Sequence, residues 1–253
     1  MNPIFIGGMG GSGTRAFAKV CLAADCKMGK RNPTEDAAQF IDFYNKWVTS
    51  QKYFNLSALQ RKQMENEFLT KVDLYEKECE VGENNIWGAK NTRSIWALDL
   101  INKVLPDAKY IHILKDGRDI VYRGQPTSLL KYRPRYEQQR KIEKGLSEHQ
   151  FWMQFWSVHN LEAYQYGSQY MPGRYMWCRY EDLIYHSKRT LDCLSALTGL
   201  NMKKLDITKV LNMKRATKNL GKWKTFSPEK INRLNKLGYE GLVHFGYLER
   251  GWQ

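Results

Sequence analysis

A cluster of glycines near the start of the chain limits most strongly what this sequence can fold into. The apolar residues 4–6 are followed by five glycines within seven residues, over positions 7–13, and then by a helical stretch over 16–24. A strand, a glycine turn and a helix N-terminus together form an anion cradle. The glycines let backbone N–H groups approach the anion, and the helix dipole favours negative charge. The pattern therefore predicts a phosphate-binding loop; the alternative is a glycine-rich turn without a ligand.

This loop departs from that of nucleoside triphosphate-binding proteins at two positions. The spacing from Gly8 to Gly13 fits the frame G-x-x-x-x-G-K-S/T. The next two residues are Thr14 and Arg15, so the lysine and the metal-holding hydroxyl of that frame are both displaced. The loop is therefore suited to a phosphate-like group held without the usual lysine and Mg²⁺.

Strand and helix patterns alternate along the rest of the chain. We expect strands at 86–90, 109–114 and 174–179, and helices at 34–50, 57–80, 93–104, 147–166 and from 183 to 198. Thr34 is a suitable N-cap for the first of these helices. The alternation predicts an α/β fold of three layers, with a mostly parallel, P-loop-like central sheet flanked by helices and with ligands at the carboxyl ends of the strands. We expect one domain over residues 1–253.

Composition narrows the class of partner. The chain has 253 residues and a formal net charge of +14, which favours anionic partners such as nucleotides or acidic glycans. The five cysteines are scattered without C-x-x-C spacing, so neither a disulfide framework nor a metal site is indicated. No apolar run approaches the roughly 18 residues of a membrane span, and the first strand leaves no room for a signal peptide. We expect a cytoplasmic protein, unless an N-terminal anchor has been removed.

One segment resembles neither strand nor helix. Residues 126–146 are polar and irregular, with six basic and two acidic residues from Lys131 to Leu146. A connection of this length is either a lid or substrate loop over a site, or a solvated link between elements.

The clusters that follow the strands resemble, in this order, the sulfotransferases that use 3′-phosphoadenosine-5′-phosphosulfate (PAPS). The segment Gly11-Ser12-Gly13-Thr14-Arg15 is similar to the 5′-phosphosulfate loop of that family, commonly Pro-Lys/Arg-Ser-Gly-Thr-Thr. The resemblance implies that this loop, from Gly10 to Arg15, holds the 5′-phosphate. Gly11 stands where the family often has a catalytic cation, so Arg15 or Lys90 must supply that charge if the chain is active.

Two later segments extend the resemblance. Trp87-Gly-Ala-Lys90 looks like the family's strand that ends in a lysine near the transferred sulfuryl group, where a cation stabilises charge on the bridging oxygen. Lys115-Asp-Gly-Arg-Asp119, with Arg123 eight residues after Lys115, resembles the 3′-phosphate loop. Both cationic side chains suit a phosphate, and Arg123 can bind one bidentately.

The C-terminal part carries a fourth match. Gly221-Lys222-Trp223-Lys224 looks like the family's Gly-x-Trp-Lys segment, which closes over the nucleotide. By this resemblance Lys218, Lys222 and Lys224 contribute to the 3′-phosphate site, with Trp223 anchoring the segment. The tyrosine of Arg179-Tyr180-Glu-Asp resembles the one that approaches the adenine.

Sulfuryl transfer to a hydroxyl also needs a base within roughly 3 Å of that hydroxyl. Several family members place a histidine two residues after the strand lysine, but Thr92 stands there. Asp36 and Glu35 lie about twenty residues past the glycine loop, where some glycan- and tyrosine-directed members carry a glutamate. They are the candidate bases, and Asn32 is a candidate for substrate binding; the alternative is that the acids only cap a helix. His112, in the middle of a strand, is expected to be packed.

The leading interpretation is a PAPS-dependent sulfotransferase that acts without a metal and leaves adenosine 3′,5′-bisphosphate (PAP). Its acceptor would be a hydroxyl on a glycan, which can be anionic, or on a small molecule. A P-loop nucleotide or small-molecule kinase is an alternative, which the missing loop lysine disfavours. A second alternative is a non-catalytic module that binds nucleotides or anions. It stays open because Gly11 stands at the position of the usual catalytic cation. Nucleic-acid binding is the weakest, because the basic residues are dispersed and no recognition motif is present.

Overall fold

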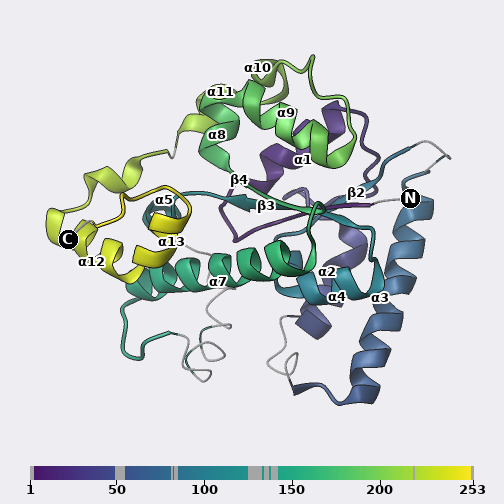
Figure 1. Cartoon of the computed structure of the whole chain (residues 1–253), viewed down its shortest axis with the longest axis horizontal. Coiled ribbons are helices and arrows are strands. Elements are labelled where there is room, and N and C mark those ends of the chain that lie inside the picture. The colour runs from purple at the N-terminus through teal and green to yellow at the C-terminus, as the bar shows by residue number, and fades with distance from the viewer. Residues whose placement is uncertain are drawn as a thin grey trace.

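The computed structural model describes residues 3–48, 55–80, 82, 85–124, 133, 137, 142–218 and 220–251. Within these ranges, four parallel strands form a central sheet in the order β2-β1-β3-β4, flanked on both faces by helices (Figure 1). The strands are β1 (Ile4–Gly7), β2 (Gly88–Lys90), β3 (Lys109–Leu114) and β4 (Tyr175–Arg179). The predicted three-layer α/β class is confirmed.

The helices differ widely in length. The α-helices are α1 (Thr14–Ala23), α2 (Ile41–Phe43), α3 (Ala58–Glu78), α4 (Leu98–Val104), α5 (Gly117–Arg123), α7 (Glu148–Tyr170), α8 (Tyr180–Tyr185), α9 (Ser187–Thr198), α10 (Ile207–Val210), α11 (Met213–Thr217), α12 (Pro228–Leu237) and α13 (Tyr239–His244). Short 3-10 helices occupy Ala38–Phe40, Thr92–Ala97 and Lys222–Thr225, and a π-helix occupies Tyr44–Val48. No helix of the described residues is long and apolar enough to cross a membrane.

Alternating side chains of β1 explain the three layers. Ile4 and Ile6 pack on one face of the sheet, in the core shared with α1, α8 and α9, whereas Phe5 packs on the other face with α2, α3 and α4. Successive side chains of a strand point to opposite faces, so a fully buried parallel strand is apolar on both. Figure 1 shows α7 running along the same face as α2 and α4, and α1, α8 and α9 on the opposite face.

The register of the sheet brings the strand ends together. Ile6 pairs with Lys90, and Leu114 at the end of β3 pairs with Arg179 at the end of β4. Strand β2 lies on one side of β1, and β3 lies on the other, so the strand order reverses at β1. Open α/β sheets bind ligands outside the carboxyl ends of their strands at such a point. The segments that follow β1, β2, β3 and β4 are therefore neighbours in space.

The expectation of a helix from 34 to 50, capped by Thr34, is wrong at its start. The Thr34 hydroxyl donates to the carboxylate of Asp36, Glu35 has a left-handed φ of 62°, and helical structure begins only at Ala38. The polar residues before Ala38 form hydrogen bonds with one another instead of capping the helix, which Asp, Asn, Ser and Thr side chains commonly do. Most of the segment expected as a lid, 126–146, lies outside the described residues.

Candidate functional site

The glycine loop, residues 8–13, joins the end of β1 to the start of α1. Gly13 has a φ of 95° and occupies the N-cap position of α1. A Cβ on Gly13 would lie 2.2 Å from Cδ2 of Tyr180, so the ring of Tyr180 covers this position and leaves no room for a side chain. The first turn of α1 contains no acidic residue. The partial positive charge of its N-terminus is therefore not offset by a carboxylate of that turn, and the loop is open to an anion.

Ser12 supplies an independent sign of an anion site. Its side chain is 1% exposed, and Oγ has no hydrogen-bond partner among the described residues. A buried hydroxyl left without a partner costs about 1–3 kcal/mol. A phosphate oxygen at the loop would accept a hydrogen bond from this hydroxyl and remove that cost.

A second loop, residues 30–38, is closed largely by the side chain of Asn32; we call it the Asp36 loop. Asn32 Oδ1 accepts hydrogen bonds from the backbone N–H groups of Thr34 and Asp36, both at 2.9 Å, and lies 2.7 Å from the Thr34 hydroxyl oxygen. The backbone N–H of Asn32 donates to the Asp36 carbonyl at 3.0 Å. These bonds fix where Asp36 stands relative to the rest of the loop.

The Asp36 loop is attached to the end of β2. The backbone N–H of Ala37 donates to the Lys90 carbonyl at 2.8 Å. Lys90 Nζ donates to Asp36 Oδ1 at 2.8 Å and to the Thr34 carbonyl at 2.9 Å. The Lys90 side chain is only 3% exposed. The carboxyl end of β2 therefore carries an ion pair between the Lys90 ammonium group and the Asp36 carboxylate.

The electrostatics of this pair keep the carboxylate ionised. Burial raises the pKa of Asp36, but the charge of Lys90 and hydrogen bonds from Lys90, Thr34 and Thr92 more than offset it, so the net pKa is lowered. Burial lowers the pKa of Lys90, and Asp36 offsets this only in part, so the pKa of Lys90 is also lowered. Arg15 is a further cause of the lowered Lys90 pKa, which places a second cation near Lys90.

The residues after β3 and β4 form the other side of the site. Lys115 Nζ lies 4.9 Å from the centre of the Tyr180 ring, and the Tyr180 hydroxyl donates to the Ala216 carbonyl at 3.0 Å. Burial lowers the pKa of Lys115, and Asp119 offsets this in part. Arg123 ends α5. Tyr180 thus links the glycine loop, Lys115 and the α11 segment.

These elements enclose a cleft of about 1100 Å³, which we call the main cleft. The predicted site residues that line it are Gly10, Gly11, Gly13, Thr14, Arg15, Glu35, Asp36, Lys90, Lys115, Arg123, Tyr180 and Lys218. Eight of the lining side chains are basic and two are acidic. A cleft with this balance attracts a multiply charged anion.

Comparison with known proteins identifies the family. Residues 3–204 match the family model described as "Sulfotransferase family". The chain belongs to the sulfotransferase family. A search of curated protein sequences finds no match.

Solved sulfotransferase structures resemble this one at low sequence identity. The sulfotransferase domain of the Synechococcus PCC 7002 olefin synthase has a TM-score of 0.56 and 15% identity, with 98% of this chain and 96% of that chain covered. A sulfotransferase from Mycobacterium avium has a TM-score of 0.54 and 10% identity, with 96% and 76% covered. A retinol dehydratase in complex with androsterone and inactive cofactor PAP has a TM-score of 0.41 and 12% identity, with 99% and 82% covered. At these identities the likeness to the first two structures shows the fold.

The C-terminal segment of the chain lies beyond the matched residues and is fixed to α5. Asp119 accepts hydrogen bonds from the backbone N–H groups of Gly221 at 2.7 Å and Trp223 at 3.2 Å. The guanidinium of Arg118 lies 3.6 Å from the centre of the Trp223 ring. Trp223 is therefore an anchor. Lys222, Trp223 and Lys224 do not line the main cleft of the described residues, unlike Lys218.

Arg118 has a structural role. Its side chain is buried and bonded to Asp116, to Asn235 Oδ1 at 2.9 Å and to the Tyr247 carbonyl at 3.0 Å. These contacts join the start of α5 to the C-terminal helices. Arg118 holds the loop that carries Lys115 and does not line the cleft.

The sequence analysis did not assign three of the basic residues that line the main cleft, Lys19, Lys214 and Arg215, and it placed His112 correctly. Lys19 lines the cleft one turn after Arg15, and the i, i+4 spacing on α1 was the available signal. His112 is fully buried between Tyr175 Oη at 2.7 Å and Asn160 Oδ1 at 2.9 Å. Burial lowers its pKa to about 4, so it is a neutral core residue. Among the described residues, no group of three or more His, Cys, Asp or Glu side chains could hold a metal ion.

Proposed function

We propose that this sulfotransferase moves the sulfuryl group of PAPS to a hydroxyl acceptor, with Asp36 as the base. The observation that carries the proposal is that the Asp36–Lys90 pair and the glycine loop line the same basic cleft. Transfer to a hydroxyl needs an anion site, a cation near the leaving group and a proton acceptor in one place. The main cleft has residues suited to each role, namely the glycine loop, Lys90 with Arg15, and Asp36.

The donor fits the residues that are present. The orphaned Ser12 hydroxyl and the N–H groups of the glycine loop suit the 5′-phosphate, and the absence of a side chain at Gly13 lets the Tyr180 ring lie against the loop. Lys115, Arg123 and Lys218 are the cations assigned to the 3′-phosphate, since all three line the cleft. Tyr180 is the side chain assigned to the adenine. Two phosphate groups on one nucleotide account for basic residues on both sides of the cleft.

The reaction then needs one proton transfer and one exchange of S–O bonds. Asp36 accepts the proton of the acceptor hydroxyl, and the acceptor oxygen forms a bond to sulfur. The bond from sulfur to the 5′-phosphate oxygen breaks, and the electron pair stays on the phosphate of PAP. Lys90 and Arg15 stabilise the negative charge that grows on that leaving oxygen, as preorganised cations do.

A thermal-shift experiment tests the nucleotide assignment against a kinase. At about 100 times its dissociation constant a ligand adds about 2.7 kcal/mol of stability, which raises the melting temperature of a domain this size by roughly 5–10 °C. We expect this shift with PAP and a smaller one with ATP and Mg²⁺. Stabilisation by ATP with Mg²⁺ alone would overturn the proposal. Binding of PAP without any release of PAP from PAPS, across a broad acceptor set, would favour the non-catalytic module.

A further inference from the structure

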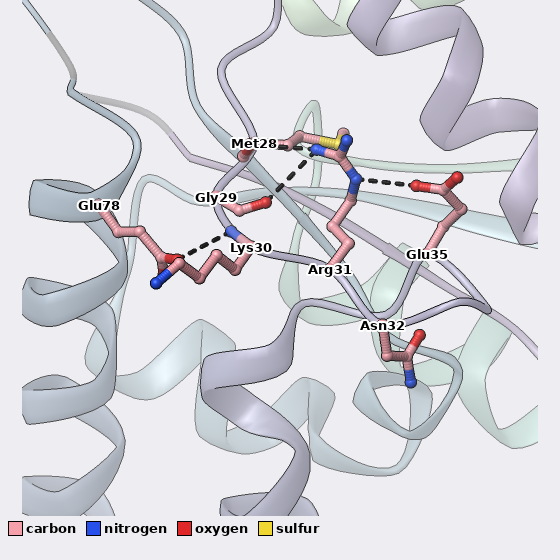
Figure 2. Close-up of a pocket in the computed structure, with 7 residues that line it drawn as sticks. All are labelled: Met28, Gly29, Lys30, Arg31, Asn32, Glu35 and Glu78. Atoms are coloured by element: carbon pink, nitrogen blue, oxygen red, sulfur yellow. Dashed lines mark hydrogen bonds and ion pairs between the residues drawn. The ribbon is translucent and has the colours of Figure 1, made fainter.

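A second pocket lies beside the main cleft, with which it shares Glu35. Its volume is about 520 Å³, and we call it the side cavity. It is lined by residues 28–32, by Glu35 and by Glu78 at the end of α3 (Figure 2). The side cavity is shallow and open to solvent. None of the roles assigned to the nucleotide uses this cavity.

Glu35 connects the side cavity to the reacting centre. It lines both the side cavity and the main cleft, and it directly precedes Asp36. Glu35 is held in its left-handed conformation by an ion pair with Arg31 Nε at 2.8 Å and by a hydrogen bond from its N–H to the Asn32 carbonyl at 2.8 Å. A molecule whose hydroxyl reaches Asp36 can therefore extend over Glu35 into the side cavity.

Hydrogen bonds hold the residues that line the side cavity in place. Arg31 Nη1 donates to the Met28 carbonyl at 3.1 Å and to the Gly29 carbonyl at 3.4 Å, and the N–H of Gly29 donates to the Tyr75 hydroxyl at 3.1 Å. The N–H of Lys30 donates to Glu78 Oε1 at 3.0 Å. Figure 2 shows the Arg31 guanidinium between the Gly29 carbonyl and the Glu35 carboxylate, with Lys30 extending beside Glu78.

The chemistry of the side cavity differs from that of the main cleft. It contains two basic side chains, Lys30 and Arg31, and two carboxylates, Glu35 and Glu78, with Met28 as its one apolar side chain. In each carboxylate one oxygen accepts a bond from the loop, and the other has no partner among the described residues. Free carboxylate oxygens accept hydrogen bonds from hydroxyl groups, and the charges balance. An anionic group would meet two carboxylates, and an apolar group would desolvate four charged side chains.

We infer that the side cavity binds the acceptor, and that the acceptor is an uncharged, hydroxyl-rich molecule of the oligosaccharide class. The inference rests on the proposed function and specifies its acceptor. One hydroxyl meets Asp36, and further hydroxyls donate to Glu35 and Glu78 and accept a hydrogen bond from the Lys30 ammonium group. The remote contacts contribute to the affinity for the acceptor, equally in the ground state and the transition state.

The acceptor class is tested by supplying radiolabelled PAPS with three sets of alcohols. The sets are neutral oligosaccharides (cello-, chito- and milk oligosaccharides), anionic glycans (heparosan, chondroitin and hyaluronan) and sterol alcohols. We expect label on a neutral oligosaccharide. Label confined to the anionic glycans or the sterols would overturn the inference, and so would PAP binding with no labelled oligosaccharide. If PAP itself does not bind, the proposed function fails first, and calorimetry with PAP distinguishes the two failures.

Two substitutions in the side cavity test the site itself. Glu78→Gln removes the charge but keeps an oxygen for the Lys30 N–H, and Lys30→Gln changes only the side chain that lines the cavity. For the best neutral acceptor we expect KM to rise about tenfold in each variant, the effect of one lost charged hydrogen bond, with kcat and PAP affinity unchanged. Asp73→Asn, an exposed carboxylate on the same helix and outside the cavity, is the matched control. If both variants fold with the KM of the control, the side cavity does not bind the acceptor.

Discussion

Lys90 Nζ lies 2.8 Å from Asp36 Oδ1, although 54 residues separate the two in the chain. Two features of the fold produce this contact. Strand β2 pairs in parallel with β1, and the Asp36 loop is attached to β2 by the hydrogen bond from the Ala37 N–H to the Lys90 carbonyl. A buried ammonium group is costly without a partner, and Asp36 supplies one. The base and the cation of the proposed reaction are therefore already held in place beside the glycine loop.

Asp36→Asn tests the base. The amide cannot accept the proton, so kcat should fall at least about 100-fold, in the range typical of a lost general base. PAP affinity should stay within about twofold, because Asp36 is not assigned to the phosphates; twofold is roughly 0.4 kcal/mol. Steady-state kinetics and calorimetry measure the two quantities, with the exposed Asp107→Asn as control. Full turnover by Asp36→Asn would remove this residue as the base.

The lowered pKa of Lys90 predicts a loss of activity at alkaline pH. Burial lowers this pKa below its ordinary value, with Asp36 offsetting only part of the effect. As pH rises through the lowered pKa, Lys90 loses its proton and no longer stabilises the leaving oxygen, so kcat should decline. Lys90→Arg should have a lower kcat but keep it to higher pH, because a guanidinium stays protonated. If kcat declined over the same alkaline pH range in the wild-type protein and in Lys90→Arg, a group other than Lys90 would be responsible for the decline.

Asn32 is predicted to be a positioning residue, because its side-chain carbonyl oxygen accepts hydrogen bonds from two backbone N–H groups of the Asp36 loop. Asn32→Ala should lower the free energy of unfolding by about 1–3 kcal/mol and should also lower kcat, since Asp36 loses its support. Asn32→Asp keeps an acceptor oxygen and should recover most of the stability and turnover. Urea unfolding and kinetics measure both. Equal kcat in Asn32→Ala and the wild-type protein would show that the loop holds Asp36 without this side chain.

The sequence predicted the parts of the molecule that depend on local patterns. The strand at 109–114 could be predicted because a short apolar run indicates a buried strand. The glycine loop could be predicted because clustered glycines indicate a turn. The convergence of Lys90, Lys115 and Tyr180 followed from the rule that parallel strands end at one edge.

The Asp36 loop could not be predicted in the same way. Thr34, Glu35 and Asp36 have the composition of a helix start, and the alternative depends on Asn32 and on Lys90, far away in the chain. The side cavity likewise requires the end of α3 to meet residues 28–32. Both the Asp36 loop and the side cavity depend on tertiary contacts, which local sequence propensities do not reveal.

The 3′-phosphate assignment predicts which basic residues control nucleotide affinity. Lys115→Ala and Arg123→Ala should each weaken PAP binding about tenfold or more, as lost charged hydrogen bonds do. Lys224→Ala should weaken it less, since Lys224 does not line the main cleft of the described residues. Calorimetry with PAP measures each affinity, with the exposed Lys236→Ala as control. Unchanged affinity in both Lys115→Ala and Arg123→Ala would refute the assignment.

Arg15 is the residue expected to replace the cation that Gly11 does not supply. It lines the main cleft, and its charge contributes to the lowered pKa of Lys90. Arg15→Ala should reduce kcat about 100-fold, a loss typical of one transition-state contact. Because a neighbouring positive charge is removed, the pKa of Lys90 should rise, and the alkaline limb of kcat should move to higher pH. Lys19→Ala, one turn further along α1, removes a charge from the same cleft and should leave that limb in place. An unchanged kcat and an unmoved limb in Arg15→Ala would leave Lys90 as the cation that acts alone.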